Sequence, residues 1–304
     1  MQKILKVLTL IQNIMNQTND HNKNFKYYNI FAVLGHMVSA IAMIFLIKDK
    51  DPLIIPYTES YSEWTNVNNG TCTQGSRSFE TNNGNFCIGT TTKPVYCNDD
   101  GCYGLNLGWL IISFHLLSFF FQSLASISDI FPFFGYQYSK MIEDNKNPLR
   151  FIEYSFSASI MLISIALLNG VTDINLITSI AVLTSACQLC GLAVEFVKEL
   201  KIKWLLHLTG WLQFFWAYGI IGHAFFKSID VAKENSTPGP PDFVYIIVIA
   251  LFLLYASFGF VQLYELINFN NFNPFKKEKA YIILSLTAKL LLGWMIFSNV
   301  LILS

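Results

Sequence analysis

The last apolar stretch of the chain, Ala280–Trp294, contains a single charged residue, Lys289. No other charged residue lies between Lys279 and the end of the chain. A lysine near the middle of a membrane helix costs about 2.5–3.5 kcal/mol on insertion scales, and such a residue usually has a function and a partner. Glu153, inside another apolar stretch, is the candidate partner. A carboxylate that faces a buried lysine can hold a protonated Schiff base, since a desolvated amine attacks an aldehyde readily.

Four polar residues are placed where they could contact this pair. Ser285 lies four residues before Lys289, and Ser157 lies four residues after Glu153, so each shares a helical face with its neighbour. His36 and His115 sit well inside two further apolar stretches. Ser157 is nearly as consistent with simple helix packing. A lone buried histidine is more often structural, although two of them favour a polar site.

The composition predicts an integral membrane protein. Of the 304 residues, 53% are hydrophobic and only 13% are charged, which is too apolar for a soluble domain of this length. Aromatic residues make up 15%, as expected for helices with interfacial belts. The net charge is zero, so nothing indicates a nucleic-acid partner.

We expect an all-α bundle of seven transmembrane helices, because seven apolar segments are long enough to span a bilayer. They lie near residues 28–48, 105–128, 150–170, 174–196, 203–227, 242–268 and 279–302. Residues 1–27 mix apolar and basic positions at helical spacing. We interpret them as a cytoplasmic amphipathic helix rather than a cleaved signal peptide, because Lys6 interrupts the apolar run.

The lysines and arginines outside the apolar segments predict the orientation. Thirteen of them lie on the side that carries the N-terminus and six lie on the other. The positive-inside rule therefore places the N-terminus in the cytoplasm and the C-terminus outside the cell or in a lumen. Cleavage of the first residues would weaken this argument.

The long polar segment 49–104 is predicted to lie outside. It contains Cys72, Cys87, Cys97 and Cys102, which suggest two disulfides in an oxidising compartment, with three pairings open. Asn69 in this segment and Asn235 before the sixth helix are glycosylation sequons on the same side. Strand-like pieces such as Thr91–Tyr96 predict a small β-hairpin.

Two sequence motifs resemble those of one family of light-absorbing proteins. Arg150-Phe-Ile-Glu-Tyr154 has the spacing of the third-helix motif of microbial rhodopsins, with Glu in place of Asp. Residues 148–161 and 280–294 resemble the third and seventh helices of the heliorhodopsins. The resemblance covers residues 28–302 and includes the long outer segment and the inverted orientation.

This resemblance implies a retinal-binding membrane domain, 28–302, in which Lys289 binds all-trans retinal as a protonated Schiff base. It implies that Glu153 is the counterion, and that Ser285 replaces the second carboxylate of proton pumps. It also implies that His36 and His115 belong to a polar cavity near the Schiff base. Tyr154 is a candidate neighbour of the counterion.

Aromatic residues of the fifth and sixth helices are candidates for the walls of a retinal pocket, although most such residues merely pack or face lipid. They are Trp211, Phe214, Phe215, Trp216 and Tyr218, with Phe252, Tyr255, Phe258 and Phe260.

Two further groups of residues are expected to have structural roles only. Cys187 and Cys190 are expected to pack as small apolar residues and not to bind metal. Asp129, Glu195, Lys198 and Glu265 are expected to be interfacial charges.

Three functions compete. A photoreceptor that signals to an unknown cytoplasmic partner is favoured, because Ser164 replaces the proton donor of outward pumps. A light-gated or passive proton channel is the alternative, with Glu195 and Glu265 as its candidate residues. A seven-helix receptor without a chromophore would leave Lys289 unexplained. No enzymatic activity is expected, and the resemblance implies a homodimer in the lipid bilayer.

Overall fold

The computed structural model describes residues 27–48, 53–66, 77–81, 84–94, 97–98, 101–102, 104–128, 137–268 and 273–301. The predicted amphipathic helix at the N-terminus, the sequon at Asn69, Cys72 and Asp129 lie outside these ranges. Those predictions are therefore not tested by the fold.

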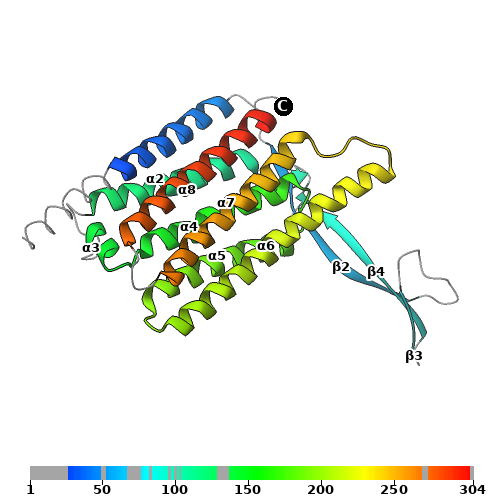
Figure 1. Ribbon diagram of the computed structural model, residues 1–304. Coiled ribbons are helices and arrows are strands. Elements are labelled where there is room, and N and C mark those ends of the chain that lie inside the picture. Colours follow the sequence, from blue (N-terminus) through cyan, green and yellow to red (C-terminus); the bar gives the residue numbers. More distant parts are fainter. Residues whose placement is uncertain are drawn as a thin grey trace, which may run out of the picture.

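Seven helices of at least 21 residues lie side by side in the described part of the chain, which confirms the predicted bundle (Figure 1). They are Tyr27–Ile47, α2 (Leu107–Ile127), α4 (Pro148–Leu168), α5 (Ile174–Phe196), α6 (Leu200–Glu234), α7 (Asp242–Ile267) and α8 (Pro274–Ile296). The short helix α3 (Tyr138–Glu143) lies at one end of the bundle, which we call the α3 end. A π-helical turn, η1 (Phe297–Leu301), follows α8.

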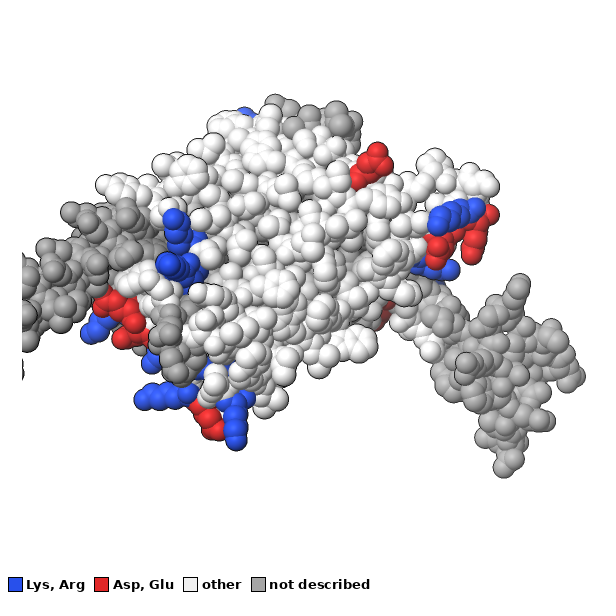
Figure 2. All heavy atoms as spheres, viewed as in Figure 1, with Lys and Arg blue, Asp and Glu red and all other residues white. Residues whose placement is uncertain are grey.

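The bundle has the surface of a membrane protein. Six of the seven helices, all except α6, are long and apolar enough to cross a membrane. Large apolar side chains face outward along them, for example Phe31 and Leu253, which are 67% and 61% exposed. Figure 2 shows that the described charged residues gather towards the two ends and leave the middle of this face largely without charge. This distribution matches a hydrocarbon layer between two polar boundaries.

Two helices begin or end outside their predicted apolar segments. α6 runs from Leu200 to Glu234 because no proline interrupts it before Pro238, whereas hydropathy marks only its apolar part. α8 begins at Pro274, where the side chain of Asn273 accepts hydrogen bonds from the Phe275 and Lys276 amides at 2.9 and 3.2 Å. Residues 276–279 are thus helical and not part of a loop.

A narrow β-structure projects from the end opposite α3, which we call the sheet end (Figure 1). Its strands all pair antiparallel, so the predicted hairpin is confirmed. They are β1 (Ile54–Pro56) with β7 (Gly104–Asn106), β2 (Thr58–Asn66) and β3 (Arg77–Thr81) on either side of β4 (Gly84–Pro94), and β5 (Cys97–Asn98) with β6 (Gly101–Cys102). On the solvent-exposed stem of β2 and β4, Ser60 and Thr92 pair through their hydroxyls at 3.0 Å.

The register places two of the four outer cysteines opposite each other. Cys97 and Cys102 are Cα partners across the β5–β6 pair. Cys87 lies in β4 and is buried. The predicted disulfide pairing stays a prediction, because Cys72 and the side chains of Cys97 and Cys102 are outside the described part.

One aspartate attaches the hairpin to the bundle. Asp173 caps α5, where its Oδ1 accepts from the amides of Asn175 at 2.9 Å and Leu176 at 3.3 Å. Its Oδ2 accepts from the Ser60 amide of β2 at 3.0 Å, and the neighbouring Thr58 amide donates to the Thr172 carbonyl at 3.0 Å. Although partial burial raises the pKa of Asp173, these hydrogen bonds outweigh burial and hold the pKa below its usual value of 3.8.

We expect Asp173→Asn to lower thermal stability at neutral pH by about 1 kcal/mol, because the single oxygen of asparagine can cap α5 or accept from the Ser60 amide but not both. A depressed pKa contributes stability above pH 3.8, and this contribution disappears as the pH falls through the lower pKa of the folded state. The difference in melting temperature between wild type and variant should therefore shrink below pH 3.8. Thermal unfolding in detergent at several pH values measures it. A difference that is constant with pH would contradict a charged cap.

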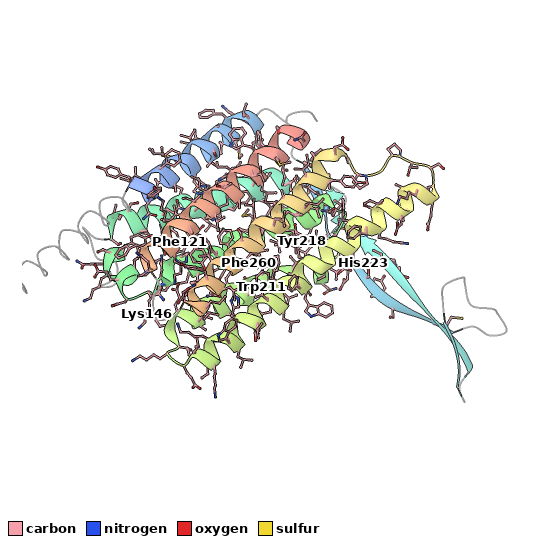
Figure 3. The ribbon with its side chains drawn as sticks, in the orientation of Figure 1. Phe121, Lys146, Trp211, Tyr218, His223 and Phe260 are labelled. Atoms are coloured by element: carbon pink, nitrogen blue, oxygen red, sulfur yellow. The ribbon has the colours of Figure 1, made fainter. Side chains whose placement is uncertain are left out.

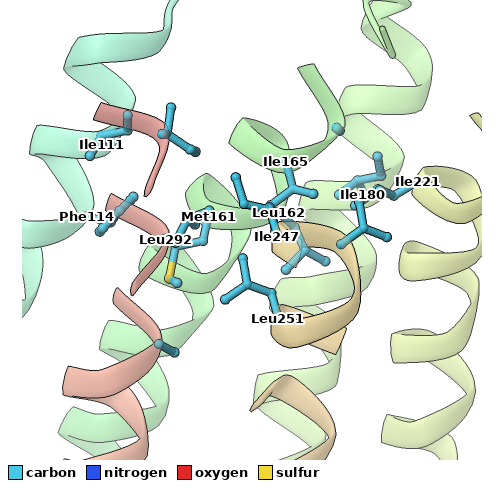
Figure 4. Packing of buried hydrophobic residues seen from close by; sticks show 14 of the residues in the cluster. Ile111, Phe114, Met161, Leu162, Ile165, Ile180, Ile221, Ile247, Leu251 and Leu292 are labelled. Atoms are coloured by element: carbon cyan, nitrogen blue, oxygen red, sulfur yellow. The ribbon is translucent and has the colours of Figure 1, made fainter. Parts of the chain in front are cut away.

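Apolar side chains fill the half of the bundle near the sheet end (Figure 4). The residues at its centre are almost completely buried and come from six helices: Ile111, Phe114, Met161, Leu162, Ile165, Ile180, Ile221, Ile247, Leu251 and Leu292. We call this set the apolar plug. Such close packing excludes water from the centre of this half. The half near α3 is built differently, with buried polar and charged residues.

Candidate chromophore site

The structure brings Lys289 and Glu153 together in the interior. Lys289 Nζ on α8 donates to Glu153 Oε1 on α4, and both residues are 3% exposed. The ammonium also contacts the hydroxyls of Ser118 at 2.6 Å and Ser285 at 3.0 Å. A buried ammonium is tolerated only with such compensation. The pair predicted from the sequence is therefore present, and it is neutral as a unit.

Serines surround the carboxylate as well. Ser157 Oγ donates to Glu153 Oε1 at 3.3 Å, one helical turn away as its spacing predicts. Ser118 on α2 donates to the same oxygen at 2.6 Å and so contacts both members of the pair. Ser118 was not among the residues predicted from the sequence. Its position one turn after His115, on the same helical face, was the available signal.

Arg150 does not pair with Glu153. Instead it donates to Glu195 on α5 and to Glu278 on α8, at the α3 end of the bundle. Arg150 therefore does not compete with Lys289 for Glu153. Glu153 remains available to Lys289.

Arg150 belongs to a buried group of three cations and three carboxylates, which we call the ion cluster: Arg150, Glu195, Lys203, Glu265, Lys277 and Glu278. Each is at most 6% exposed. Lys277 bridges Glu195 at 2.8 Å and Glu265 at 2.9 Å, and Lys203 lies 3.7 Å from Glu265. The interpretation of Glu195 and Glu265 as interfacial charges is thus wrong, whereas Lys198 is exposed.

The connection between α3 and α4 closes over the ion cluster. Asn147 donates its amide N–H to Glu195 at 2.7 Å and its side chain to Glu278 at 2.8 Å. Asn145 donates to Glu265 at 2.7 Å, and the Tyr138 hydroxyl donates to Glu278 at 2.9 Å. Burial, and next the Glu278 charge, raise the pKa of Tyr138 well above its usual range. Tyr138 thus stays a neutral donor.

The two predicted histidines also meet. His36 Nδ1 and His115 Nδ1 lie 3.0 Å apart, and both side chains are completely buried. Neither Nε2 atom has a hydrogen-bond partner in the described structure. Gly293 leaves the space for this pair, because a Cβ atom there would lie 2.6 Å from His115 Nε2. Their role as proton acceptors stays a prediction.

Tyr154 packs against the lysine. The Lys289 ammonium lies 5.1 Å from the centre of its ring, within the range of a cation–π contact. The Tyr154 hydroxyl donates to the Tyr281 carbonyl at 3.2 Å and so does not reach the carboxylate. Tyr154 is therefore a wall residue of the site.

A cavity extends from Lys289 between α4, α5, α6 and α7, with an empty volume of ≈ 820 Å³ including its mouth. Four of the predicted aromatic residues line it: Trp211, Phe214, Tyr255 and Phe258. Trp211 is in contact with Phe260, which faces outward from α7 (Figure 3). Cys187 also lines the cavity, and no group of metal ligands occurs in the described ranges.

The prediction for Trp216 is wrong. Its side chain is 65% exposed on the outer face of α6 and does not line the cavity. Helical geometry explains this, because Trp211, Phe214 and Tyr218 share the inward face at spacings of three and four residues. Trp216 is five residues after Trp211 and points about 140° away.

The cavity suits a long apolar molecule that carries an aldehyde. Its walls are mainly aromatic and aliphatic, and Lys289 presents the amine on one wall. His207, Gln262 and Trp211 are also on the lining, where Trp211 Nε1 donates to His207 Nε2 at 2.9 Å. Gly259 lets the Trp211 ring lie flat against α7, since a Cβ atom there would approach the ring to 2.5 Å. The amine can form an imine, and Glu153 can stabilise its proton.

The fold is that of a microbial rhodopsin. The structure is similar to the crystal structure of thermophilic rhodopsin from Rubrobacter xylanophilus, with a TM-score of 0.56 at 13% identity. The match covers 92% of this chain and 97% of that one. No protein of curated function matches the sequence.

A family match is more specific than the similarity of the fold. The family model named Heliorhodopsin matches residues 25–301, which include every described helix. The chain therefore belongs to the heliorhodopsin family. A retinal chromophore is what this family implies, and the cavity around Lys289 has the amine, the carboxylate and the apolar walls to accept one.

Proposed function

We propose that the protein is a photoreceptor with all-trans retinal bound to Lys289 as a protonated Schiff base and Glu153 as its counterion. One observation carries this proposal: a buried lysine paired with a single carboxylate opens onto a large, mainly apolar cavity. Retinal supplies visible absorption and light-driven isomerisation when it is bound. The protein supplies the position, the counterion and the exclusion of water.

Each residue of the site has a defined task in this proposal. Glu153 holds the proton on the Lys289 nitrogen by charge, at a distance where opposite charges act strongly in a dry interior. Ser118 and Ser285 fix the direction of the nitrogen by their contacts at 2.6 and 3.0 Å. Trp211 and Phe214 confine the polyene from α6. The proton on the Lys289 nitrogen therefore has one carboxylate nearby, that of Glu153.

Signalling is favoured over pumping because the positions of a pump relay hold serines. Ser285 contacts Lys289, and Ser164 donates to the Ile160 carbonyl at 2.9 Å. We place the α3 end and the N-terminus in the cytoplasm, and the sheet end and C-terminus outside, following the distribution of lysine and arginine. The cytoplasmic end would then change shape for a partner.

The structure also weakens the case for a channel. The two candidate channel residues, Glu195 and Glu265, are held in the ion cluster by Arg150, Lys277 and Lys203. A carboxylate bound by two cations is a poor acceptor for a travelling proton.

On the outer side, we retain glycosylation at Asn235 and two disulfides as proposals. Asn235 ends α6 in an exposed turn, where a glycan can be accommodated. A homodimer in the membrane is likewise proposed from the family resemblance.

The test is a visible absorption spectrum of the purified protein after addition of all-trans retinal, with whole-cell recording under illumination. We expect a visible band that moves to the near ultraviolet on bleaching with hydroxylamine, and no photocurrent. A folded protein without a visible band would overturn the proposal. A photocurrent that requires the band would replace the photoreceptor by the channel.

A further inference from the structure

A chain of hydrogen bonds crosses the cavity wall that α5, α6 and α7 form. Trp211 Nε1 donates to His207 Nε2 at 2.9 Å, one turn earlier on α6. His207 Nδ1 lies 3.1 Å from Gln262 Oε1 on α7, and Gln262 Nε2 donates to the Gly191 carbonyl on α5 at 3.1 Å. All four residues line the cavity. The chain therefore joins three helices at the place where a chromophore would lie.

The chain also determines the tautomer of His207. An indole N–H can only donate, so His207 Nε2 is the unprotonated nitrogen that accepts from Trp211. The proton of the neutral ring is then on Nδ1, which donates to Gln262 Oε1. His207 and Gln262 are 4% and 7% exposed, so bulk water does not readily replace either partner. His207 thus fixes the direction of the Trp211 ring through a fully bonded imidazole.

Three contacts between α6 and α7 lead from this ring to the ion cluster. They recur once per helical turn, because their members are four residues apart on α6 and three apart on α7. They are Trp211 with Gly259, His207 with Gln262, and Lys203 with Glu265. We call this set the α6–α7 series. Its first contact lines the cavity, and its last belongs to the ion cluster at the α3 end.

α5 follows the same series on its other side. Gly191 accepts from Gln262 at the middle contact. Glu195, one turn further along α5, is joined to Glu265 at the last contact, because Lys277 bonds to both carboxylates at 2.8 and 2.9 Å. Hydrogen bonds and ion pairs of buried side chains therefore run without a gap from the cavity wall to the ion cluster.

We propose that His207 is a positioning residue that holds the Trp211 ring against the chromophore and couples movement of this ring to Glu265 in the ion cluster. Light changes the shape of a polyene that Trp211 confines, so the ring is pushed. With His207 in place, the push reaches Gln262 on α7, whereas without it the ring can turn alone. The coupling rests on the proposed function, whereas the position of Trp211 does not.

The first test uses the full chain without retinal. Nitrogen-15 NMR of labelled indoles, with the Trp211 signal assigned by its loss in Trp211→Phe, should show a downfield N–H that exchanges slowly with D₂O. In His207→Leu this signal should move upfield and exchange faster. In His207→Gln it should stay, because the glutamine side chain can accept from Trp211 and donate to Gln262. A signal that is identical in wild type and His207→Leu would overturn the proposal.

The second test follows the return to the dark state after a flash, by visible absorption. His207→Leu should return about tenfold more slowly, the kinetic equivalent of one hydrogen bond that stabilises the dark position of the ring. His207→Gln should return at the wild-type rate. Equal slowing in both variants would show that His207 does not act through its hydrogen bonds. A protein that forms no visible band would refute the proposed function and the coupling, while the NMR result would still decide the position of Trp211.

The third test examines the coupling itself, by light-minus-dark infrared difference spectra. Wild type should show a change in the carboxylate band of Glu265, assigned by its shift in Glu265→Asp. Gln262→Met breaks only the second link, so it should lose this band and keep the Trp211 NMR signal, and it tests the coupling even where His207→Leu does not fold. A band of full size in Gln262→Met would exclude the proposed coupling.

Thr209→Val is the matched control for all three measurements. Thr209 is also on α6, its hydroxyl donates to the Leu205 carbonyl at 2.8 Å, and it does not line the cavity. The variant should match wild type in the Trp211 signal, the rate of return and the Glu265 band. A change in Thr209→Val as large as that in His207→Leu would mean that any substitution on α6 has this effect, and it would overturn the proposal.

Discussion

Replacement of Lys289 by alanine should abolish the visible band completely when all-trans retinal is added. The side chain provides the amine that opens onto the cavity, and alanine offers no nitrogen for an imine. The substitution also leaves the Glu153 carboxylate buried without its cation, which costs about 3–5 kcal/mol for a pair that stays charged. Absorption spectra of wild type and variant, compared at equal protein concentration, measure the effect.

Loss of colour must be separated from loss of the fold. Lys289→Arg keeps a positive charge beside Glu153 and still cannot form an imine, so it should be folded and colourless. The double variant Lys289→Ala with Glu153→Gln removes both charges and should recover thermal stability without recovering colour. A visible band in any of these variants would show that another amine binds retinal, and the buried Lys203 and Lys277 would then be examined.

Replacement of Glu153 by glutamine should move the visible band to longer wavelength. As the pH is raised, the band of the variant should also be lost at a lower pH than the band of wild type. The carboxylate stabilises the positive charge at the nitrogen in the ground state, and excitation moves that charge away from it. Without the carboxylate, the nitrogen loses its proton at a pH lower by about one to three units. Titration of the visible band against the near-ultraviolet band gives both numbers.

Ser157→Ala provides the comparison for this result. Ser157 reaches Glu153 only through a hydrogen bond of 3.3 Å, so its loss should change the titration far less than the loss of the charge. Equal effects from the two substitutions would mean that the polarity of the pocket, and not the charge of Glu153, holds the proton. An unchanged titration in Glu153→Gln would remove Glu153 from the role of counterion.

The site could be recognised from the sequence because membrane interiors contain few charges. A lysine and a glutamate inside apolar segments stand out, since each costs several kcal/mol without a partner. The apolar helices were located for the same reason: the segment predicted at 150–170, which carries Glu153, is α4 at Pro148–Leu168. Ser157 and Ser285 followed from helical spacing alone.

The ion cluster could not be predicted from charges inside apolar segments, because its residues lie at the ends of helices. At a helix end, a charged side chain can reach water or turn into the bundle, and the hydropathy of the sequence is the same for both orientations. The last helix was predicted to begin near 279, whereas the Asn273 cap starts α8 early enough to bury Lys277 and Glu278. Trp216 failed for a related reason. An aromatic run shows no strong periodicity, so which ring points inward depends on how α6 is rotated in the bundle.

The length of α6 determines how far its end moves when the helix tilts. Its 35 residues extend over about 52 Å, against about 30 Å of hydrocarbon, so part of the helix stands in water beside the hairpin. Trp211 lies in the cavity wall, and about 35 Å of continuous helix separates it from Glu234. A rigid rod of that length that tilts by about 5° moves its tip by about 3 Å. A helix of this length would turn a small tilt at the cavity into a larger displacement at its far end.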